Sequence, residues 1–189
     1  MRIVGGTFRG KKLALPTDKR IRPTGDRTRE ALFNILSHGS GFRTDRGALP
    51  IGAHVLDVFS GTGALGLEAL SRGAEHVTFM DNHADSLRLV KANVAALGCQ
   101  RQASILNRDG TRPGRAARAM DLILMDPPYG LVLENPCLQA LNENGWISPE
   151  TLIVIEQTSK EKNTDYSGFE TLDVRKYGAA LLTFLKRSA

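Results

Sequence analysis

A strand, a glycine-rich turn and a helix follow one another between residues 54 and 70. The apolar segment 54–59 is typical of a strand, and apolar residues then recur at helical spacing through Leu70. The turn between them is made of small residues: Ser60, Gly61, Thr62, Gly63 and Gly66. Such a turn brings backbone N–H groups and a helix N-terminus close to a ligand. This unit predicts an α/β fold with a cofactor site at the turn.

Three further apolar segments, 77–80, 103–106 and 121–125, have the length of buried strands. Alternating strands and helices imply right-handed crossovers and a mostly parallel sheet. In such sheets, ligands bind beyond the carboxyl ends of the strands. Each of the four strand ends carries an aspartate: Asp57, Asp81, Asp109 and Asp126. The coincidence of four carboxylates predicts a ligand site along that edge of the sheet.

The type of cofactor follows from charge. Gly61, Gly63 and Gly66 match the dinucleotide fingerprint, which is also the pattern of an NAD site. A carboxylate at Asp57 would repel a pyrophosphate there, but it would attract the ammonium and sulfonium groups of S-adenosylmethionine. Asp81 follows the glycines by about 20 residues, the spacing of a carboxylate that accepts from ribose hydroxyls in either cofactor. We therefore favour S-adenosylmethionine and keep an NAD-dependent oxidoreductase as an alternative.

The expected cofactor contacts lie in the turn and at three strand ends. They are Asp57, Phe59, Ser60, Gly61, Thr62, Gly63, Asp81, Asn82, Asp109 and Gly110. Asp109 is placed to receive the adenine amino group, and a solvated turn aspartate is an equal interpretation of the same residue.

The fourth strand leads directly into Asp126, Pro127, Pro128 and Tyr129. An amine on a nucleobase is a poor nucleophile because its lone pair is delocalised into the ring, so an enzyme must hold both N–H bonds. Asp126 and the Pro127 carbonyl supply two acceptors, since consecutive prolines form a stiff segment without N–H donors. Tyr129 offers a ring for base stacking, worth about 1–3 kcal/mol. We interpret Asp126, Pro127 and Tyr129 as catalytic residues; the alternative is an ordinary turn after a strand.

Positive charge is concentrated at the N-terminus. The net charge is +5, but the first 29 residues contain nine basic and two acidic residues, a net +7. Clustered arginine and lysine are typical of contacts to a phosphate backbone, although a basic face can also serve solubility alone. The predicted RNA contacts are Arg9, Lys11, Lys12, Arg20, Arg22 and Arg27. A second cluster is either an RNA rim on the cofactor side or a solvated loop: Arg108, Arg112, Arg115 and Arg118.

Periodicity and turn residues place the remaining elements. Those before the glycine turn are a hairpin of 2–4 with 12–15, a helix over 26–37 and a polar loop over 39–51. Those after the motif are a helix over 131–142, a strand over 151–156 and a hairpin of 169–177 with 179–186. We expect a basic extension, 1–38, and a catalytic domain, 39–189, in one compact unit.

Composition fits a soluble single domain. A chain of 189 residues with 41% hydrophobic residues is long enough to bury a substantial core. It contains no apolar run of the roughly 20 residues that a membrane span needs and no signal-peptide core, so we expect a cytoplasmic protein. The two cysteines, Cys99 and Cys137, do not have the spacing of metal ligands, and the four histidines do not have it either. We therefore expect no metal.

Motifs along nearly the whole chain resemble the bacterial 16S ribosomal RNA guanine-N2 methyltransferases that modify guanine 966. The most specific motifs are N-terminal: RIVGG at 2–6, RG at 9–10, RPT at 22–24 and RTREALFNIL at 27–36. Others are LGLEALSRGA at 65–74, DPPYG at 126–130 and KYG at 176–178. The chain departs from the family in two places. Asp81 stands where glutamate is frequent, and the turn reads SGTG at 60–63 where AGSG is common.

The resemblance implies a Rossmann-like class I methyltransferase fold, with a mostly parallel seven-stranded sheet, helices on both faces and a short N-terminal hairpin and helix. It implies methyl transfer from S-adenosylmethionine, leaving S-adenosylhomocysteine, to the N2 amine of a guanine in 16S ribosomal RNA. The RNA would be free or within the small subunit or its precursor, and we expect a monomer. Two alternatives are an adenine-N6 DNA methyltransferase, which would use the same amine grip, and a non-catalytic ribosome-assembly factor.

Overall fold

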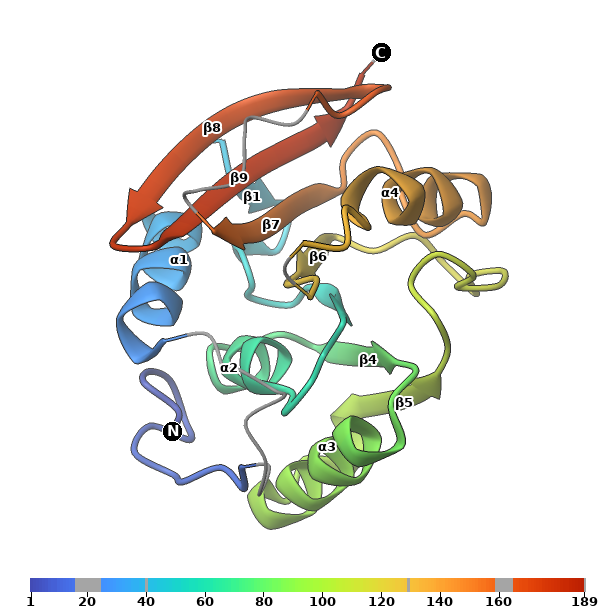
Figure 1. Cartoon of the computed structure of the whole chain (residues 1–189). Coiled ribbons are helices and arrows are strands. Elements are labelled where there is room, and N and C mark those ends of the chain that lie inside the picture. Colours follow the sequence, from blue (N-terminus) through green and yellow to red (C-terminus); the bar gives the residue numbers. More distant parts are fainter. Residues whose placement is uncertain (16–24, 40, 129, 159–164, 189) are drawn as a thin grey trace.

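A seven-stranded sheet runs through the protein (Figure 1), whose computed structural model describes residues 1–15, 25–39, 41–128, 130–158 and 165–188. The strand order is β5-β4-β3-β6-β7-β9-β8. The bounds are β3 His54–Val58, β4 His76–Asp81, β5 Ala103–Asn107, β6 Leu122–Met125, β7 Leu152–Thr158, β8 Phe169–Tyr177 and β9 Ala180–Arg187. Neighbours run parallel from β5 to β7, whereas β9 is antiparallel to both β7 and β8. The predicted sheet is confirmed.

Helices cover both faces of the sheet (Figure 1). α1 (Asp26–His38), α2 (Ala64–Ser71) and α3 (Ala84–Leu97) pack on one face, and α4 (Glu134–Glu143) packs on the other. Strands covered on both sides must be apolar throughout, and all four residues of β6 are buried. Among the described residues, no helix combines the length and apolar composition needed to cross a membrane.

The N-terminal arm, residues 1–15, folds back on itself and lies against α2. Its two segments pair antiparallel as expected, but the pairing is a single bridge between Arg2 and Lys12 rather than two regular strands. The ladder stops there because the next N–H groups, of Val4 and Gly5, donate to the carboxylate of Glu68 on α2 instead. The helix expected over 26–37 is confirmed as α1.

Two segments differ from expectation. The polar loop over 39–51 contains a small hairpin of β1 (Arg43–Thr44) and β2 (Gly47–Ala48). The helix expected from residue 131 begins at Glu134 as α4. The delay has a backbone cause: Gly130 and Val132 have φ angles of 79° and 48°, which a right-handed helix does not allow.

The two C-terminal strands form the predicted hairpin, joined through Gly178, whose φ angle is 59°. β8 lies at the edge of the sheet and pairs with β9. A bulge between Thr171 and Asp173 shifts the register of this pairing. The hairpin places β9 against β7 and so completes the sheet on the side away from β5.

Candidate active site

The side chain of Asp57, near the end of β3, is buried beneath the start of α2. Its Oδ2 accepts a hydrogen bond from the Gly66 N–H at 2.9 Å, and the residue is 1% exposed. Position 66 must be glycine for this approach, because an added Cβ would lie 2.4 Å from a ring carbon of Phe79 and 3.0 Å from Asp57 Oδ2. Asp57 therefore fixes the glycine turn and helix α2 against β3.

Burial raises the pKa of Asp57 well above its ordinary value of 3.8, while the Gly66 N–H lowers it. The carboxylates of Asp126 and Asp81 raise the pKa of Asp57 further. The three residues come from neighbouring strand ends, because β3 pairs in parallel with both β4 and β6. A charged Asp57 would repel the pyrophosphate of NAD. Burial opposes that charge, so a cation at the turn would be needed to favour the ionised form.

Asp81 ends β4 and braces the glycine turn from the side. Its Oδ2 accepts from the Gly61 N–H at 2.9 Å, and its Oδ1 accepts from the His83 N–H at 2.8 Å. Gly61 and Gly63 have φ angles of 54° and 77°, the left-handed region that favours glycine. The carboxylate thus holds the turn in the shape in which α2 begins.

Asp109 and Asn82 connect the ends of β5 and β4. Asp109 Oδ1 accepts from both the N–H and the hydroxyl of Thr111, each at 2.8 Å, and Oδ2 accepts from Asn82 Nδ2 at 3.3 Å. These hydrogen bonds, those of Thr111 first, lower the pKa of Asp109, so it stays ionised. The bonds to Thr111 are those of a turn aspartate, and the bond to Asn82 turns the second oxygen toward the neighbouring strand end.

The floor of the site lies at Phe59, Ser60 and Gly110. Phe59 has a φ angle of 60°, which turns the chain sharply after β3. Ser60 Oγ is buried and has no hydrogen-bond partner among the described residues. At Gly110 an added Cβ would lie 2.8 Å from Val58 Cγ1 and 3.0 Å from Phe59 Cζ, so the backbone passes tightly over β3. A buried hydroxyl without a partner among the described residues suits a ligand that carries hydroxyl or amino groups.

The segment that we expect to bind the target amine begins at Asp126, directly after β6. Asp126 is half-buried, Pro127 is buried and Pro128 is exposed. Because β6 pairs with β3 in the register Met125 to Val58, Asp126 enters the same edge of the sheet as the glycine turn. Tyr129 lies outside the described residues, so its stacking role stays a prediction.

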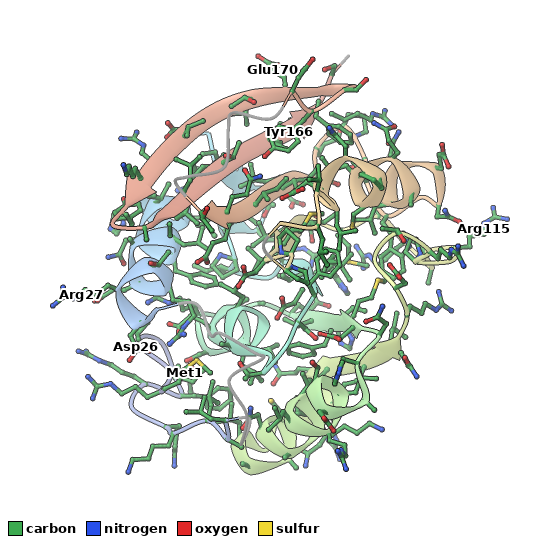
Figure 2. All side chains as sticks on the ribbon, viewed as in Figure 1. Met1, Asp26, Arg27, Arg115, Tyr166 and Glu170 are labelled. Atoms are coloured by element: carbon green, nitrogen blue, oxygen red, sulfur yellow. The ribbon has the colours of Figure 1, made fainter. Side chains whose placement is uncertain are left out.

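The predicted RNA contacts divide into three groups. Arg9, Lys11 and Lys12 are exposed on the N-terminal arm. Arg27 is exposed on α1 and extends away from the protein (Figure 2). Arg20 and Arg22 lie outside the described residues. The four exposed side chains give the N-terminal arm and the start of α1 a basic surface.

The second arginine cluster does not form one rim on the cofactor side. β5 pairs in parallel with β4, β4 with β3 and β3 with β6, so these strands all run in one direction. Residues 108–121 must therefore return from the carboxyl end of β5 to the amino end of β6. Arg108 N–H donates to the Asp81 carbonyl near the site, whereas Arg118 lies 2.8 Å from His54 Nε2 at the amino end of β3. Arg115 projects from this crossover, far from Arg27 in the view of Figure 2.

Sequence reasoning missed a buried ionic cluster beneath the arm. Arg29, counted in the basic segment, is fully buried: its Nη2 donates to the Arg2 carbonyl at 2.6 Å and to Asp26 Oδ1 at 2.9 Å. Its Nε lies 3.7 Å from Oε2 of Glu68, which is also fully buried. Arg29 is thus unavailable to RNA. The available signal was Glu68 itself, a lone acidic residue in the otherwise apolar segment 64–70.

Within the described ranges, no three histidine, cysteine, aspartate or glutamate side chains gather as a metal site would require. The described carboxylates of the site instead accept hydrogen bonds from the turn and from neighbouring loops.

Comparisons with known proteins agree on a family. A family model described as conserved hypothetical protein 95 matches residues 1–186. The ribosomal RNA small subunit methyltransferase D of Haemophilus influenzae is 36% identical over 169 residues, covering 86% of this chain and 80% of that protein. The protein of the same name from Escherichia coli K12 is 36% identical over 157 residues, covering 82% and 74%.

A solved structure described as a putative methyltransferase of Escherichia coli superposes with a TM-score of 0.82 at 29% identity, over 100% of this chain and 98% of that one. The fold and these relatives imply a cofactor of the S-adenosylmethionine type. The chain belongs to the conserved hypothetical protein 95 family and to the ribosomal RNA small subunit methyltransferase D family of class I methyltransferases.

Proposed function

We propose that the protein transfers a methyl group from S-adenosylmethionine to the N2 amine of one guanine, position 966, in 16S ribosomal RNA. One observation carries the proposal: Asp126 and Pro127 leave β6 at the edge where β3 leads into the glycine turn. The names of the relatives support ribosomal RNA as the substrate, and the N-terminal motifs support the particular guanine. Membership of a methyltransferase family argues against the NAD-dependent oxidoreductase.

The cofactor-binding residues follow from the hydrogen-bonding capacity at the strand ends. Asp81 would accept from the ribose hydroxyls, Asp109 from the adenine amino group, and Ser60 Oγ would gain the partner that it lacks. Burial raises the pKa of Asp57, so Asp57 would supply negative charge behind the turn only when a cationic group of the cofactor is bound there. S-adenosylmethionine, when bound, would supply an activated methyl group and leave as the neutral thioether S-adenosylhomocysteine, while the methylated amine would lose one N–H proton to Asp126 or to water. Phe59, Thr62, Gly63, Asn82 and Gly110 would shape the walls of the same site.

Asp126 and the Pro127 carbonyl would hold the two N–H bonds of the guanine amine. This grip orients the nitrogen lone pair, and orientation together with exclusion of water provides most of the acceleration in such a transfer. Asp126 is half-buried, which allows contact with a base while limiting water. Base-modifying enzymes rotate the target base out of its stack, and Tyr129 would stack on it there.

The basic surface of the arm and α1 would bind the RNA backbone. Arg9, Lys11, Lys12 and Arg27 are exposed. Arginine and lysine on one surface make phosphate contacts that position the nucleic acid without reading its sequence. Arg20 and Arg22 are proposed for the same role on the basis of the sequence.

Methylation of defined substrates tests the proposal. Purified protein and S-adenosylmethionine would be incubated with unmethylated 16S ribosomal RNA, with 30S subunits and with duplex DNA, and the products mapped by mass spectrometry. We expect N2-methylguanine at one position of the RNA, free or in the particle, and none in DNA. RNA carrying inosine at that position lacks only the N2 amine and should stay unmodified. Methyladenine in DNA would instead support the adenine-N6 alternative, and no product with any substrate would support an assembly factor.

A further inference from the structure

Asn93 is a buried polar residue on the inner face of α3. It is 2% exposed, and its neighbours on this face are apolar, including Val90 and Val94. A carboxamide in such surroundings costs stability unless its hydrogen bonds are satisfied. All of its described hydrogen bonds go to backbone groups of two other segments, so its placement serves those segments.

One segment is the glycine turn. Asn93 Nδ2 donates to the Thr62 carbonyl at 3.0 Å, in a fully buried hydrogen bond that spans 31 positions of sequence. Thr62 stands between Gly61, which Asp81 holds, and Gly63, which caps α2. The turn is therefore held from β4 on one side and from α3 on the other.

The other segment is the N-terminal arm. Asn93 Oδ1 accepts from the Ala14 N–H at 2.7 Å, and Nδ2 lies 3.3 Å from the Ala14 carbonyl oxygen. The same arm carries Arg9, Lys11 and Lys12. One planar carboxamide thus grips the backbone of the proposed RNA-binding arm and the backbone of the proposed cofactor turn.

The rest of the arm also attaches to the helix that starts at this turn. Glu68 accepts from the Val4 and Gly5 N–H groups at 2.9 and 2.8 Å, and Ser71 Oγ accepts from the Phe8 N–H at 2.9 Å. These contacts hold the start of the arm to α2, whereas Asn93 holds its later part at the turn itself. The carboxamide is rigid, so a shift of Thr62 and a shift of Ala14 cannot occur independently while both bonds persist.

We propose that Asn93 is a positioning residue that couples cofactor binding to RNA binding. Resting on the function proposed above, this inference adds a link between its two substrates. A ligand that orders the turn also orders the arm. The second ligand then binds without the loss of conformational entropy that this ordering requires. Such coupling is reciprocal: each ligand raises the affinity for the other by the same factor. We expect a factor of about five to ten, within the usual range for coupled sites.

The test compares the affinity for S-adenosylhomocysteine in the absence and in the presence of RNA. Calorimetry would give the affinity for S-adenosylhomocysteine without RNA and with saturating 16S ribosomal RNA, free or in the 30S subunit, whichever is methylated. In the natural protein RNA should tighten S-adenosylhomocysteine binding about five- to tenfold. In Asn93→Ala the ratio of the two affinities should fall close to one. If Asn93 had only a structural role, Asn93→Ala would lower the melting temperature and weaken S-adenosylhomocysteine binding equally with and without RNA. The ratio of these two affinities would then stay at its natural value.

Two further variants keep the test decisive. Ala14→Pro removes the N–H donor from the exposed arm without altering α3, so it should reduce the ratio even if Asn93→Ala folds poorly. Asn144→Ala is the matched control, because Asn144 Nδ2 donates to the Ala140 carbonyl within α4 at 2.8 Å, and it should keep the natural ratio.

A natural ratio of one, or an unchanged ratio in both Asn93→Ala and Ala14→Pro, would overturn the coupling. Failure of the proposed function would look different, because the natural protein would then not methylate the RNA at all.

Discussion

Asp81 on β4 holds Gly61 in the glycine turn, with 2.9 Å between its Oδ2 and the Gly61 nitrogen across 20 positions of sequence. The carboxylate proposed for the ribose hydroxyls therefore also shapes the turn that is proposed to bind the cofactor. Binding and preorganisation are joined in one side chain, so its removal should weaken cofactor binding through both.

Replacing Asp81 by alanine should weaken S-adenosylmethionine binding by about 1.5–3 kcal/mol, the range for hydrogen bonds to a charged group. The loss combines the missing ribose acceptor with a glycine turn in which Asp81 no longer holds Gly61. Isothermal calorimetry measures it, and Asp85→Ala is the matched control, because Asp85 pairs with Arg88 on α3. Unchanged affinity in a folded Asp81→Ala protein would remove Asp81 from the site.

Asp57→Asn should change how stability depends on pH. The pKa of Asp57 is raised above 3.8 in the folded protein, mainly by burial, so the folded state binds the proton more tightly than the unfolded chain. The stability that Asp57 contributes is fully present below its ordinary pKa of 3.8. This stability is lost as the pH rises through the pKa that Asp57 has in the folded protein. Asparagine keeps an acceptor for the Gly66 N–H but cannot ionise.

The free energy of unfolding of Asp57→Asn minus that of the natural protein should therefore rise as pH increases from about 4 to 7. Urea denaturation at several pH values measures this difference, in which the other titrating groups largely cancel. If this difference in the free energy of unfolding did not change with pH, burial would not raise the pKa of Asp57.

Asp126→Ala should separate binding from catalysis. We expect S-adenosylmethionine affinity to stay within a few-fold, because the role proposed for Asp126 is contact with the target amine rather than with the ribose or adenine. Methyl transfer should fall by about two to four orders of magnitude, the scale for removal of a positioned polar catalytic group. Single-turnover methylation of 16S ribosomal RNA measures the loss. Should transfer proceed at the natural rate, the amine grip would have to be assigned to other groups.

Neutralising Arg9, Lys11 and Lys12 by alanine should weaken RNA binding and flatten its dependence on salt. Each lost phosphate contact should reduce the logarithmic salt slope by about 0.7–0.9, while cofactor affinity in the absence of RNA stays nearly constant. Filter binding at several salt concentrations measures the slope. A control with the same change of charge is available on the C-terminal hairpin: Arg175, Lys176 and Lys186, all changed to alanine. Equal slopes in the two triple variants would place the phosphate contacts elsewhere.

The sequence predicted the parts of the site that depend on local pattern. The glycine turn, the strand before it and the position of Asp81 follow from apolar runs that end in a polar residue, and parallel strands bring such ends to one edge. The place of Asp126 after β6 followed for the same reason. The resemblance of the N-terminal motifs supplied the family, which no local pattern could indicate.

Contacts between distant segments could not be predicted in the same way. Glu68 binds Val4 across 64 positions and Asn93 binds Ala14 across 79, and no periodicity encodes which backbone a buried polar group will reach. Arg29 was counted as a surface charge because composition does not reveal that a side chain turns inward. The start of α4 was placed too early because nothing in the apolar pattern shows that Val132 adopts a positive φ angle.

The bulge between Thr171 and Asp173 has a consequence for the protein in a crowded solution. β8 is an edge strand, and a straight edge offers unpaired N–H and C=O groups to which a strand of another molecule can add. The bulge disturbs that row, and charged residues lie along the strand: Glu170, Asp173, Arg175 and Lys176. Leu172 and Val174 are exposed on β8 beside these charges. The bulge in β8 thus disfavours aggregation by strand addition at this edge of the sheet.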